Sequence, residues 1–315
     1  MPHKAEGQTP LMSKKLFPLL GWTAWAFLVM NLFAGPALAW GPGAHIECSN
    51  YILSNLALLA PALRKLLKAH PCAFIYGSIY PDMVLGKRFM DLARNNHQWA
   101  NAMKIMDDAR KPRERAFALG YLSHLAADTV AHNHFVPDRL LHQFDHLGRS
   151  HFMQELLFDA LLEDEVWRTA RDMARKNFSE CQALIERNLE PTPLPAILNR
   201  NVFRGAVYLM RIGGWARFNR IVRRRFPDKL EQIIVAPYLE RIHQAAIGFL
   251  NDPERAPCLH ESPAGGEILP RALQLKKTLK RMRRKAILAP ETHSELVGSF
   301  HKWREAAPEG RPAEQ

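Results

Sequence analysis

The stretch Gly120-Tyr-Leu-Ser-His124-Leu-Ala-Ala-Asp128-Thr-Val-Ala-His132-Asn-His134 places ionisable side chains among small and apolar residues. On an α-helix, residues four apart share a face, so His124, Asp128 and His132 are expected to lie along one side. Burying an imidazole beside a carboxylate costs free energy unless a cation compensates the charge. Because both groups are common zinc ligands, this stretch predicts a buried helix that helps to hold a metal.

The rest of the chain also has the 3.6-residue periodicity of helices, and alternating Val-, Ile- and Thr-rich runs are scarce. The sequence therefore predicts an all-α protein with a single multi-helix domain. Prolines, including Pro137, are expected to separate the helices. The predicted helices cover residues 43–59, 61–69, 71–79, 98–109, 112–133, 149–175, 193–212, 213–225, 227–250 and 270–286.

A second pair of ligand-type residues lies on the predicted helix 149–175. His151 and Glu155 are four residues apart and therefore share a face of that helix. A short connection between antiparallel helices would bring this pair close to His134. Taken alone, such a pair is more often a surface contact than a metal site.

Asp82 and His97 form the third group of candidate ligands. Asp82 follows Pro81 at an expected helix break, and His97 comes fifteen residues later. A lone histidine on an apolar face is more often a satisfied core residue than a ligand. The combination of this group with the two helical ones is what indicates a metal cluster.

The N-terminal region has the layout of a secretory signal peptide. Three lysines precede an uncharged run from Leu16 to Ala39 that ends in small residues, Ala37-Leu-Ala39. Cleavage after Ala39 predicts a secreted or periplasmic protein. The apolar run is also long enough to span a bilayer, so an uncleaved membrane anchor is the alternative.

Cleavage at this site would make Trp40 the first residue of the mature chain, with His45 five residues later. A free α-amine and its neighbouring carbonyl can chelate a metal, whereas an internal amide is a poor ligand. We therefore include Trp40 and His45 among the candidate metal ligands.

Together these positions form an ordered series of potential ligands: Trp40, His45, Asp82, His97, His124, Asp128, His134, His151 and Glu155. The series resembles that of the zinc-dependent phospholipase C and S1/P1 nuclease superfamily, whose members share an all-helical fold around three zinc ions. The spacing His124-x3-Asp128-x5-His134 is that of the superfamily's central motif. The resemblance covers residues 40–160.

The resemblance implies three Zn²⁺ ions per chain. The first would be held by Asp82, His97, His124 and Asp128. The second would be held by Trp40, His45 and the bridging Asp128, and the third by His134, His151 and Glu155. Asp82 is in addition the candidate catalytic residue that orients or deprotonates the attacking water. His132 is either a hydrogen-bond partner that orients one of the metal ligands or an ordinary core histidine.

The resemblance implies a phospholipase C that hydrolyses glycerophospholipids to diacylglycerol and a phosphorylated headgroup. Glu155 and the segment Phe135-Val-Pro137 favour this branch, whereas the Trp-Gly start favours an S1/P1-type nuclease acting on single strands. A non-catalytic membrane-binding relative is the third alternative. Gly43 and Met83 stand where choline-preferring phospholipases have Glu and Tyr, so the headgroup preference stays open.

The predicted organisation is a signal peptide over residues 1–39, a phospholipase C-like helical domain over residues 40–252, and a C-terminal part over residues 253–315. This last part combines a linker at 253–266, a basic helix and a tail of disorder-promoting composition.

The formal net charge of the 315-residue chain is +12. Such an excess favours an anionic partner, which would be a phospholipid or membrane surface, or nucleic acid under the nuclease alternative. No protein partner is inferred, and the oligomeric state stays open. An exported chain permits disulfides, and the four cysteines Cys48, Cys72, Cys181 and Cys258 allow three complete pairings.

Overall fold

The computed structural model describes residues 41–83, 97–142, 157–189 and 232–306, together with the single positions 213, 214, 217, 220, 221 and 224. Several predictions lie outside these residues: the signal peptide, the helix 193–212, most of the helix 213–225 and the tail after Ala306. Trp40, His151 and Glu155 also lie outside them.

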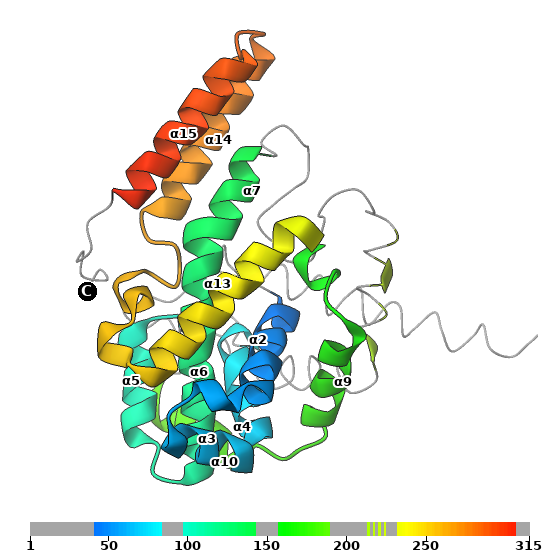
Figure 1. Cartoon of the computed structure of the whole chain (residues 1–315), viewed down its shortest axis with the longest axis vertical. Helices are drawn as coiled ribbons and strands as arrows, with labels where there is room; N and C mark the ends of the chain where they lie inside the picture. Colours follow the sequence, from blue (N-terminus) through cyan, green and yellow to red (C-terminus); the bar gives the residue numbers. More distant parts are fainter. Residues whose placement is uncertain are drawn as a thin grey trace, which may run out of the picture.

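Within the described ranges the chain forms helices and no strands, which confirms the all-α prediction (Figure 1). The helices are α2 (Pro42–Ser54), α3 (Pro61–Ala69), α4 (Pro71–Ile79), α5 (Trp99–Asp108), α6 (Pro112–Val130), α7 (Val136–His142), α9 (Asp164–Met173), α10 (Ser179–Asn188), α13 (Gln232–Asn251), α14 (Ile268–Arg284) and α15 (Pro290–Glu305). A π-helix, Ala131–Phe135, joins α6 directly to α7. Short 3₁₀ turns cover Leu56–Leu58, Tyr80–Met83, Pro253–Arg255 and Pro257–His260.

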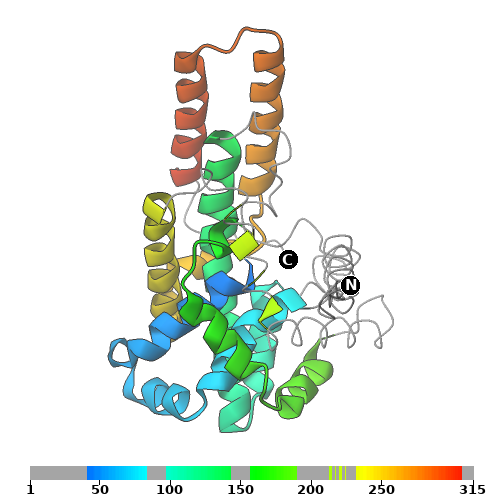
Figure 2. The ribbon, with the colours of Figure 1, turned by 90° about the vertical axis from the view of Figure 1, so that its right-hand side faces the viewer.

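Helix α6 is the centre of the fold. Every residue from Ala116 to Val130 is buried, as expected of a helix that is apolar or small on all sides. It packs against α4, α13 and α5, which surround it (Figures 1 and 2). The carboxylate of Glu114 accepts the backbone N–H groups of Arg110 and Lys111 at 3.1 and 3.2 Å, which fixes the start of the helix.

Helices α4 and α6 cross with their backbones in direct contact at two glycines. A Cβ atom added to Gly77 would overlap the carbonyl of Phe117, and one added to Gly120 would overlap the carbonyl of Phe74. Neither obstacle is a flexible side chain, so only glycine fits at these two positions. The close crossing places the end of α4 beside the middle of α6.

The start of α2 is held by a carboxylate that is distant in sequence. Asp159 is buried and accepts the backbone N–H groups of Gly43 and Ala44 at 3.0 and 3.1 Å. It therefore satisfies free donors at the helix N-terminus, where a negative charge is also favoured by the helix dipole. A side chain on Gly43 would overlap both Asp159 and the ring of Trp167.

Several predicted helices differ from those observed. The helices 61–69 and 71–79 have the predicted bounds, but Pro137 does not end a helix. The predicted helix 149–175 is interrupted by a turn at residues 160–162 before α9 begins, and α10 and α15 were not predicted. Both helices that were not predicted contain many polar residues, so their sequences show no clear apolar face. Their few buried residues are covered by neighbouring helices, which the sequence alone does not indicate.

The prediction that residues 253–266 form a linker is wrong. Ala256 and Cys258 are buried in the main core, and the segment forms two 3₁₀ turns against α13. Its many prolines and glycines serve tight turns that follow the surface of the bundle, not a free connection.

Helices α14 and α15 form a hairpin with a small apolar core of its own. Leu141 at the end of α7 packs there with Leu279 and Phe300. At the base of the hairpin, Asp138 of α7 accepts the hydroxyl of Tyr238 at 2.8 Å and the guanidinium of Arg304 at 2.7 Å. These contacts join the hairpin to α7 and α13.

The four cysteines are free thiols in the structure. Burial raises the pKa of Cys48 above its usual value, the pKa of Cys181 to about 11 and the pKa of Cys258 to about 12. A thiol with a raised pKa is a poor nucleophile at neutral pH, because the thiolate is the reactive form.

None of the helices in the described part of the chain has the length and apolar character needed to cross a bilayer.

Candidate metal centre

Five of the predicted ligands meet in one buried cluster, which we call the metal centre: His45, Asp82, His97, His124 and Asp128. They come from four elements that are far apart in sequence. His45 lies on α2, Asp82 on the 3₁₀ turn after α4, and His97 just before α5, whereas His124 and Asp128 are one turn apart on α6. The fold thus brings together candidate ligands for which the sequence indicates only the order along the chain.

Asp128 lies between the three imidazoles. Its Oδ2 atom is 3.1 Å from Nε2 of His124 and 3.4 Å from Nε2 of His97, whereas its Oδ1 atom is 3.5 Å from Nε2 of His45. The two oxygens therefore face different histidines, which is the arrangement expected of a carboxylate that bridges two ions.

Asp82 faces the same histidines from the other side. Its Oδ1 atom is 3.2 Å from Nε2 of His97, and its Oδ2 atom is 3.6 Å from Nε2 of His45. Its side chain is 9% exposed, whereas that of Asp128 is 1% exposed. Asp82 is thus at the more accessible edge of the centre.

The orientation of His124 is set by the backbone of α4. Its Nδ1 atom is 2.8 Å from the carbonyl oxygen of Ser78, and such a carbonyl can only accept. Nδ1 therefore carries the proton, and in the neutral imidazole Nε2 presents a lone pair to the centre. The Gly77–Gly120 crossing brings this carbonyl within reach of α6.

Lone pairs from several groups converge in the centre. Nε2 of His124 is 3.1 Å from Nε2 of His97 and equally close to a carboxylate oxygen of Asp128. Buried acceptor atoms this close together repel one another unless cations lie among them. Two overlapping groups have ligand atoms within 4.8 Å of one another, namely His45, Asp82 and His124, and His97, His124 and Asp128. This donor set fits zinc.

The position of His45 is fixed by contacts of α2 with α6 and α4. Its ring stacks on that of His124 with centroids 3.9 Å apart. One turn further along α2, the hydroxyl groups of Ser49 and Ser78 are 2.8 Å apart. The hydrogen-bonded anchor of Asp159 holds the other end of the same helix.

His134 lies on the π-helix and is not part of this cluster. Its Nε2 atom is 3.9 Å from the carboxylate of Glu261, which also accepts the side-chain amide of Asn133 at 3.1 Å. Glu261 in turn accepts the indole N–H of Trp99 through its backbone oxygen at 3.0 Å. Sequence analysis missed Glu261 because it lies in the segment interpreted as a linker.

Proline explains why the helix changes register at His134. Pro137 has no N–H group and cannot bond the carbonyl of Asn133, four residues earlier. That carbonyl instead accepts Arg304 of α15 at 3.3 Å. Each backbone hydrogen bond of a π-helix spans one residue more than that of an α-helix, so the four-residue spacing that places His124 and Asp128 on one face changes beyond Val130.

Replacing Arg304 by Ala is expected to lower the free energy of unfolding by about 2–4 kcal/mol. The change would leave the carbonyl of Asn133 and part of the Asp138 carboxylate without their buried donor. Urea denaturation measures the effect. The exposed Lys302 on the same helix is the matched control, and Lys302→Ala should change stability by less than about 0.5 kcal/mol. Equal losses in the two variants would contradict this role of Arg304.

His132 is fully buried and lies against Gly265. Both of its proposed roles, as hydrogen-bond partner of a metal ligand or as core histidine, stay predictions. Of the remaining candidate ligands, Trp40, His151 and Glu155 lie outside the described residues, so the second and third zinc sites that the resemblance implies stay predictions.

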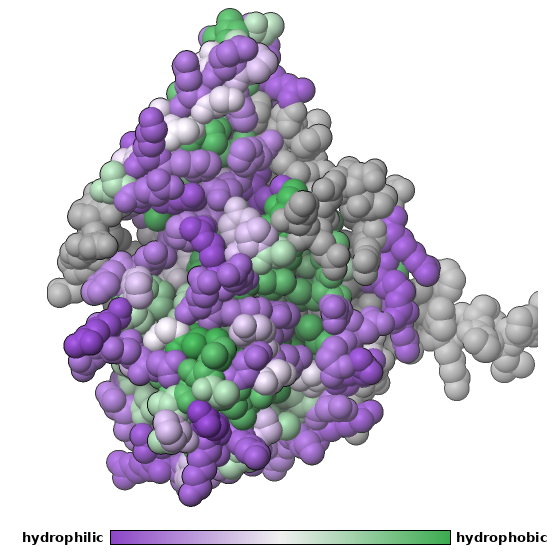
Figure 3. All heavy atoms as spheres, viewed as in Figure 1, coloured by the Kyte–Doolittle hydropathy of each residue, from purple (hydrophilic) through white to green (hydrophobic). Residues whose placement is uncertain are grey.

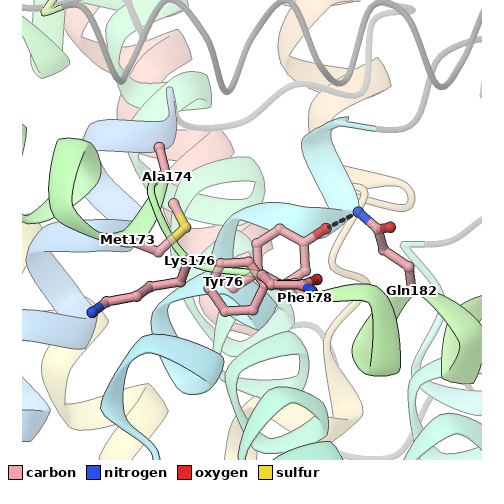
Figure 4. Close-up of a pocket in the computed structure, with 7 residues that line it drawn as sticks. Tyr76, Met173, Ala174, Lys176, Phe178 and Gln182 are labelled. Carbon is pink, nitrogen blue, oxygen red and sulfur yellow. Dashed lines mark hydrogen bonds between the residues drawn. The ribbon is translucent and has the colours of Figure 1, made fainter.

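A separate cavity of about 190 Å³ lies between α4, α9 and α10 (Figure 4). It shares no residue with the metal centre. Tyr76 and Phe178 stack with centroids 4.0 Å apart at this cavity, and Gln182 donates to the hydroxyl of Tyr76 at 3.1 Å. Burial raises the pKa of that tyrosine, so the hydroxyl stays protonated. The cavity has no cluster of reactive groups.

Residues 44–190 match the family described as zinc dependent phospholipase C. No curated protein and no solved structure matches the chain. The matched region contains the described cluster from His45 to Asp128. Residues 44–190 are thus similar to the zinc-dependent phospholipase C family, which is all-α, and this similarity supports a phospholipase-type function.

Proposed function

We propose that this protein is an exported zinc-dependent phospholipase C that cleaves the phosphodiester of glycerophospholipids. The products are diacylglycerol and a phosphorylated headgroup. The observation that carries the proposal is the buried convergence of three imidazoles and two carboxylates within the region that matches the family.

His97, His124, Asp82 and Asp128 would hold one zinc ion, and His45 with Asp128 and Trp40 a second. Bound zinc supplies a Lewis acid for the phosphate oxygens and lowers the pKa of a bound water. Ser78 fixes His124 so that its lone pair faces the centre. Asp128 offers one oxygen to each side and balances positive charge.

We assign the role of general base to Asp82. Its carboxylate is the more solvent-accessible of the two in the centre, so an attacking water can reach it. Asp82 would take the proton of that water as the water oxygen attacks phosphorus. The bond from phosphorus to the glycerol oxygen breaks, and that oxygen takes up a proton from Asp82 or from solvent. Nε2 of His97 lies 3.2 Å from this carboxylate, so one cation could be bound by both groups.

A third zinc ion at His134, His151 and Glu155 completes the proposed cluster. The carboxylate of Glu261 near His134 adds negative charge at this position, which favours a cation there. Three ions per chain is thus part of the proposal.

We propose further that the enzyme does not select choline headgroups through residue 43. A glutamate cannot be accommodated at Gly43, because Asp159 and Trp167 occupy the space that its Cβ would need. Any headgroup preference would have to come from other residues.

The proposal is tested with purified protein lacking residues 1–39, assayed with zinc and with chelator. We expect zinc-dependent release of phosphorylated headgroup from phosphatidylcholine and phosphatidylethanolamine, and no cleavage of single-stranded DNA. Mass spectrometry of exported protein should find Trp40 at the N-terminus. Cleavage of DNA but not of lipid would replace the proposal by the nuclease alternative. No turnover of any phosphodiester by the fully loaded protein would favour a non-catalytic relative.

A further inference from the structure

The hairpin of α14 and α15 projects from the helical body along the longest axis of the molecule (Figures 1 and 2). The two helices run side by side, and their connection, residues 285–289, lies at the far end. We call residues 281–289 the hairpin tip. Apart from the base of the hairpin, where α7 packs, the two helices extend beyond the rest of the described structure.

The hairpin tip is strongly cationic. From Ile268 to Ala289 the chain has eight lysine and arginine residues and no acidic residue. Arg281, Arg284 and Lys285 are exposed and form no ion pair within the described residues. Three acidic residues follow on α15, namely Glu291, Glu295 and Glu305, so the hairpin as a whole stays basic.

The same tip exposes apolar surface at its end. The side chain of Ile287 is 60% exposed, among the highest values for a large apolar residue in the described chain. Figure 3 shows hydrophobic surface at this end of the molecule, flanked by hydrophilic residues. Cations surrounding an exposed aliphatic side chain are the combination that favours the interface of an anionic bilayer.

The backbone of the tip is fixed in a conformation that turns this apolar side chain outward. Ala286 has φ of 55°, in the left-handed region that residues with a Cβ rarely adopt. The N–H groups of Ala286 and Ile287 are bonded to the carbonyls of Arg283 and Met282 at 3.0 and 3.1 Å. The turn is therefore a closed C-cap with a defined shape.

The hairpin has the internal support that a docking element needs. Leu279, Val297 and Phe300 are buried between the helices and α7. Arg271 of α14 also lies over the ring of Trp303 of α15, with its guanidinium carbon 3.8 Å from the centroid. A rigid hairpin loses little conformational entropy when it binds a surface.

We propose that the tip of the α14–α15 hairpin is a membrane-docking element that binds the surface of anionic phospholipid bilayers. Ile287 enters the interface, while Arg281, Arg284 and Lys285 contact the lipid phosphates. The inference rests on the proposed function in one respect, since an enzyme of this class must reach a lipid substrate at a bilayer.

Nucleic acid fits this surface less well than a bilayer does. Sequence-tolerant binding of single strands uses exposed aromatic rings on which bases stack. The aromatic residues of the hairpin, Phe300 and Trp303, belong to its small core, and Trp303 is covered by Arg271. The exposed apolar group at the tip is aliphatic and cannot stack.

The test is co-sedimentation of the full mature chain with vesicles of phosphatidylcholine containing phosphatidylglycerol, and with vesicles of phosphatidylcholine alone. We expect binding to the first kind of vesicle only. This binding should weaken strongly between ~0.1 M and ~1 M salt, because added salt shortens the distance over which charges attract each other. The variant Arg281→Glu/Arg284→Glu/Lys285→Glu should lower the partition coefficient by about 100-fold, because each cation near the surface contributes several-fold. Ile287→Asp should lower it by about tenfold.

Two control variants carry the same changes of charge and polarity as the tip variants, but at other places on the surface. Lys65→Glu/Lys68→Glu/Arg115→Glu reverses three exposed cations on the helical body, and Leu58→Asp adds an acid at another exposed apolar residue. Both controls should bind vesicles within about threefold of the unmodified protein, because ordinary surface changes leave local contacts elsewhere intact. Circular dichroism should show the same helix content in all variants.

The outcomes distinguish this inference from the proposed function. Hydrolysis of a water-soluble phosphodiester by the tip variants should be unchanged, because that reaction needs no bilayer. Equal vesicle binding by tip and control variants, or tighter binding to single-stranded DNA than to anionic vesicles, would overturn the docking element. A chain that binds vesicles through its tip but hydrolyses no phosphodiester would overturn the proposed function alone.

Discussion

The Asp128→Asn variant should lose phosphodiesterase activity by about 10³-fold or more. The amide keeps the shape of the carboxylate but removes the charge that faces His45, His97 and His124. Because the two oxygens face different histidines, both of the zinc ions proposed to share this residue should bind more weakly. Stabilisation of the transition state by metal is worth several kcal/mol. The measurements are kcat/KM on a soluble phosphodiester and zinc content by elemental analysis.

A matched control separates this effect from the loss of any carboxylate. Asp107 is exposed on α5, and Asp107→Asn should keep full zinc content and activity. Thermal unfolding with and without chelator gives a second readout, since zinc should stabilise the unmodified protein more than Asp128→Asn. If Asp128→Asn retained the full zinc content, the bridging role of Asp128 would be wrong.

The Gly120→Ala variant should lower the free energy of unfolding by about 3 kcal/mol or more. Its methyl group would meet the backbone carbonyl of Phe74, which cannot move without displacing α4. Displacement of α4 also moves the Ser78 carbonyl that holds His124. Zinc affinity should therefore fall together with stability, as measured by urea denaturation and by competition with a chromogenic chelator.

Gly248 provides the matched control for this helix crossing. It lies inside α13, and a Cβ atom added there meets no atom within 4 Å. Gly248→Ala should be neutral or stabilise the protein by up to about 1 kcal/mol, because alanine has the higher helix propensity. Similar behaviour of the two variants would refute the importance of the α4–α6 contact.

The sequence predicted α6 well because the features that define this helix lie close together in the chain. His124 and Asp128 lie one turn apart and meet as predicted, and the buried helix around them follows from its small and apolar residues. The register beyond Val130 was not predictable in this way. It depends on Pro137 together with Arg304, and nothing in the local sequence indicates that α15 supplies a donor at that position.

The groups that support the ligands were harder to predict than the ligands. Ser78 acts through its backbone carbonyl, which every residue type has, so no sequence pattern marks it. Asp159 lies 116 residues from Gly43, so no local pattern indicates that its carboxylate requires a glycine at position 43. Glu261 was hidden in a segment rich in proline and glycine, whose tight packing becomes apparent only in three dimensions.

The bond between Arg304 and the carbonyl of Asn133 spans 171 residues of sequence. A ribosome that has just released the α6 segment has not yet synthesised the arginine that stabilises the following π-helix. The geometry around His134 can therefore mature only after α15 has emerged, and a truncated polypeptide ending with the family region at residue 190 would lack this support. Folding of the segment around His134 thus depends on a residue that lies well beyond the end of the matched region.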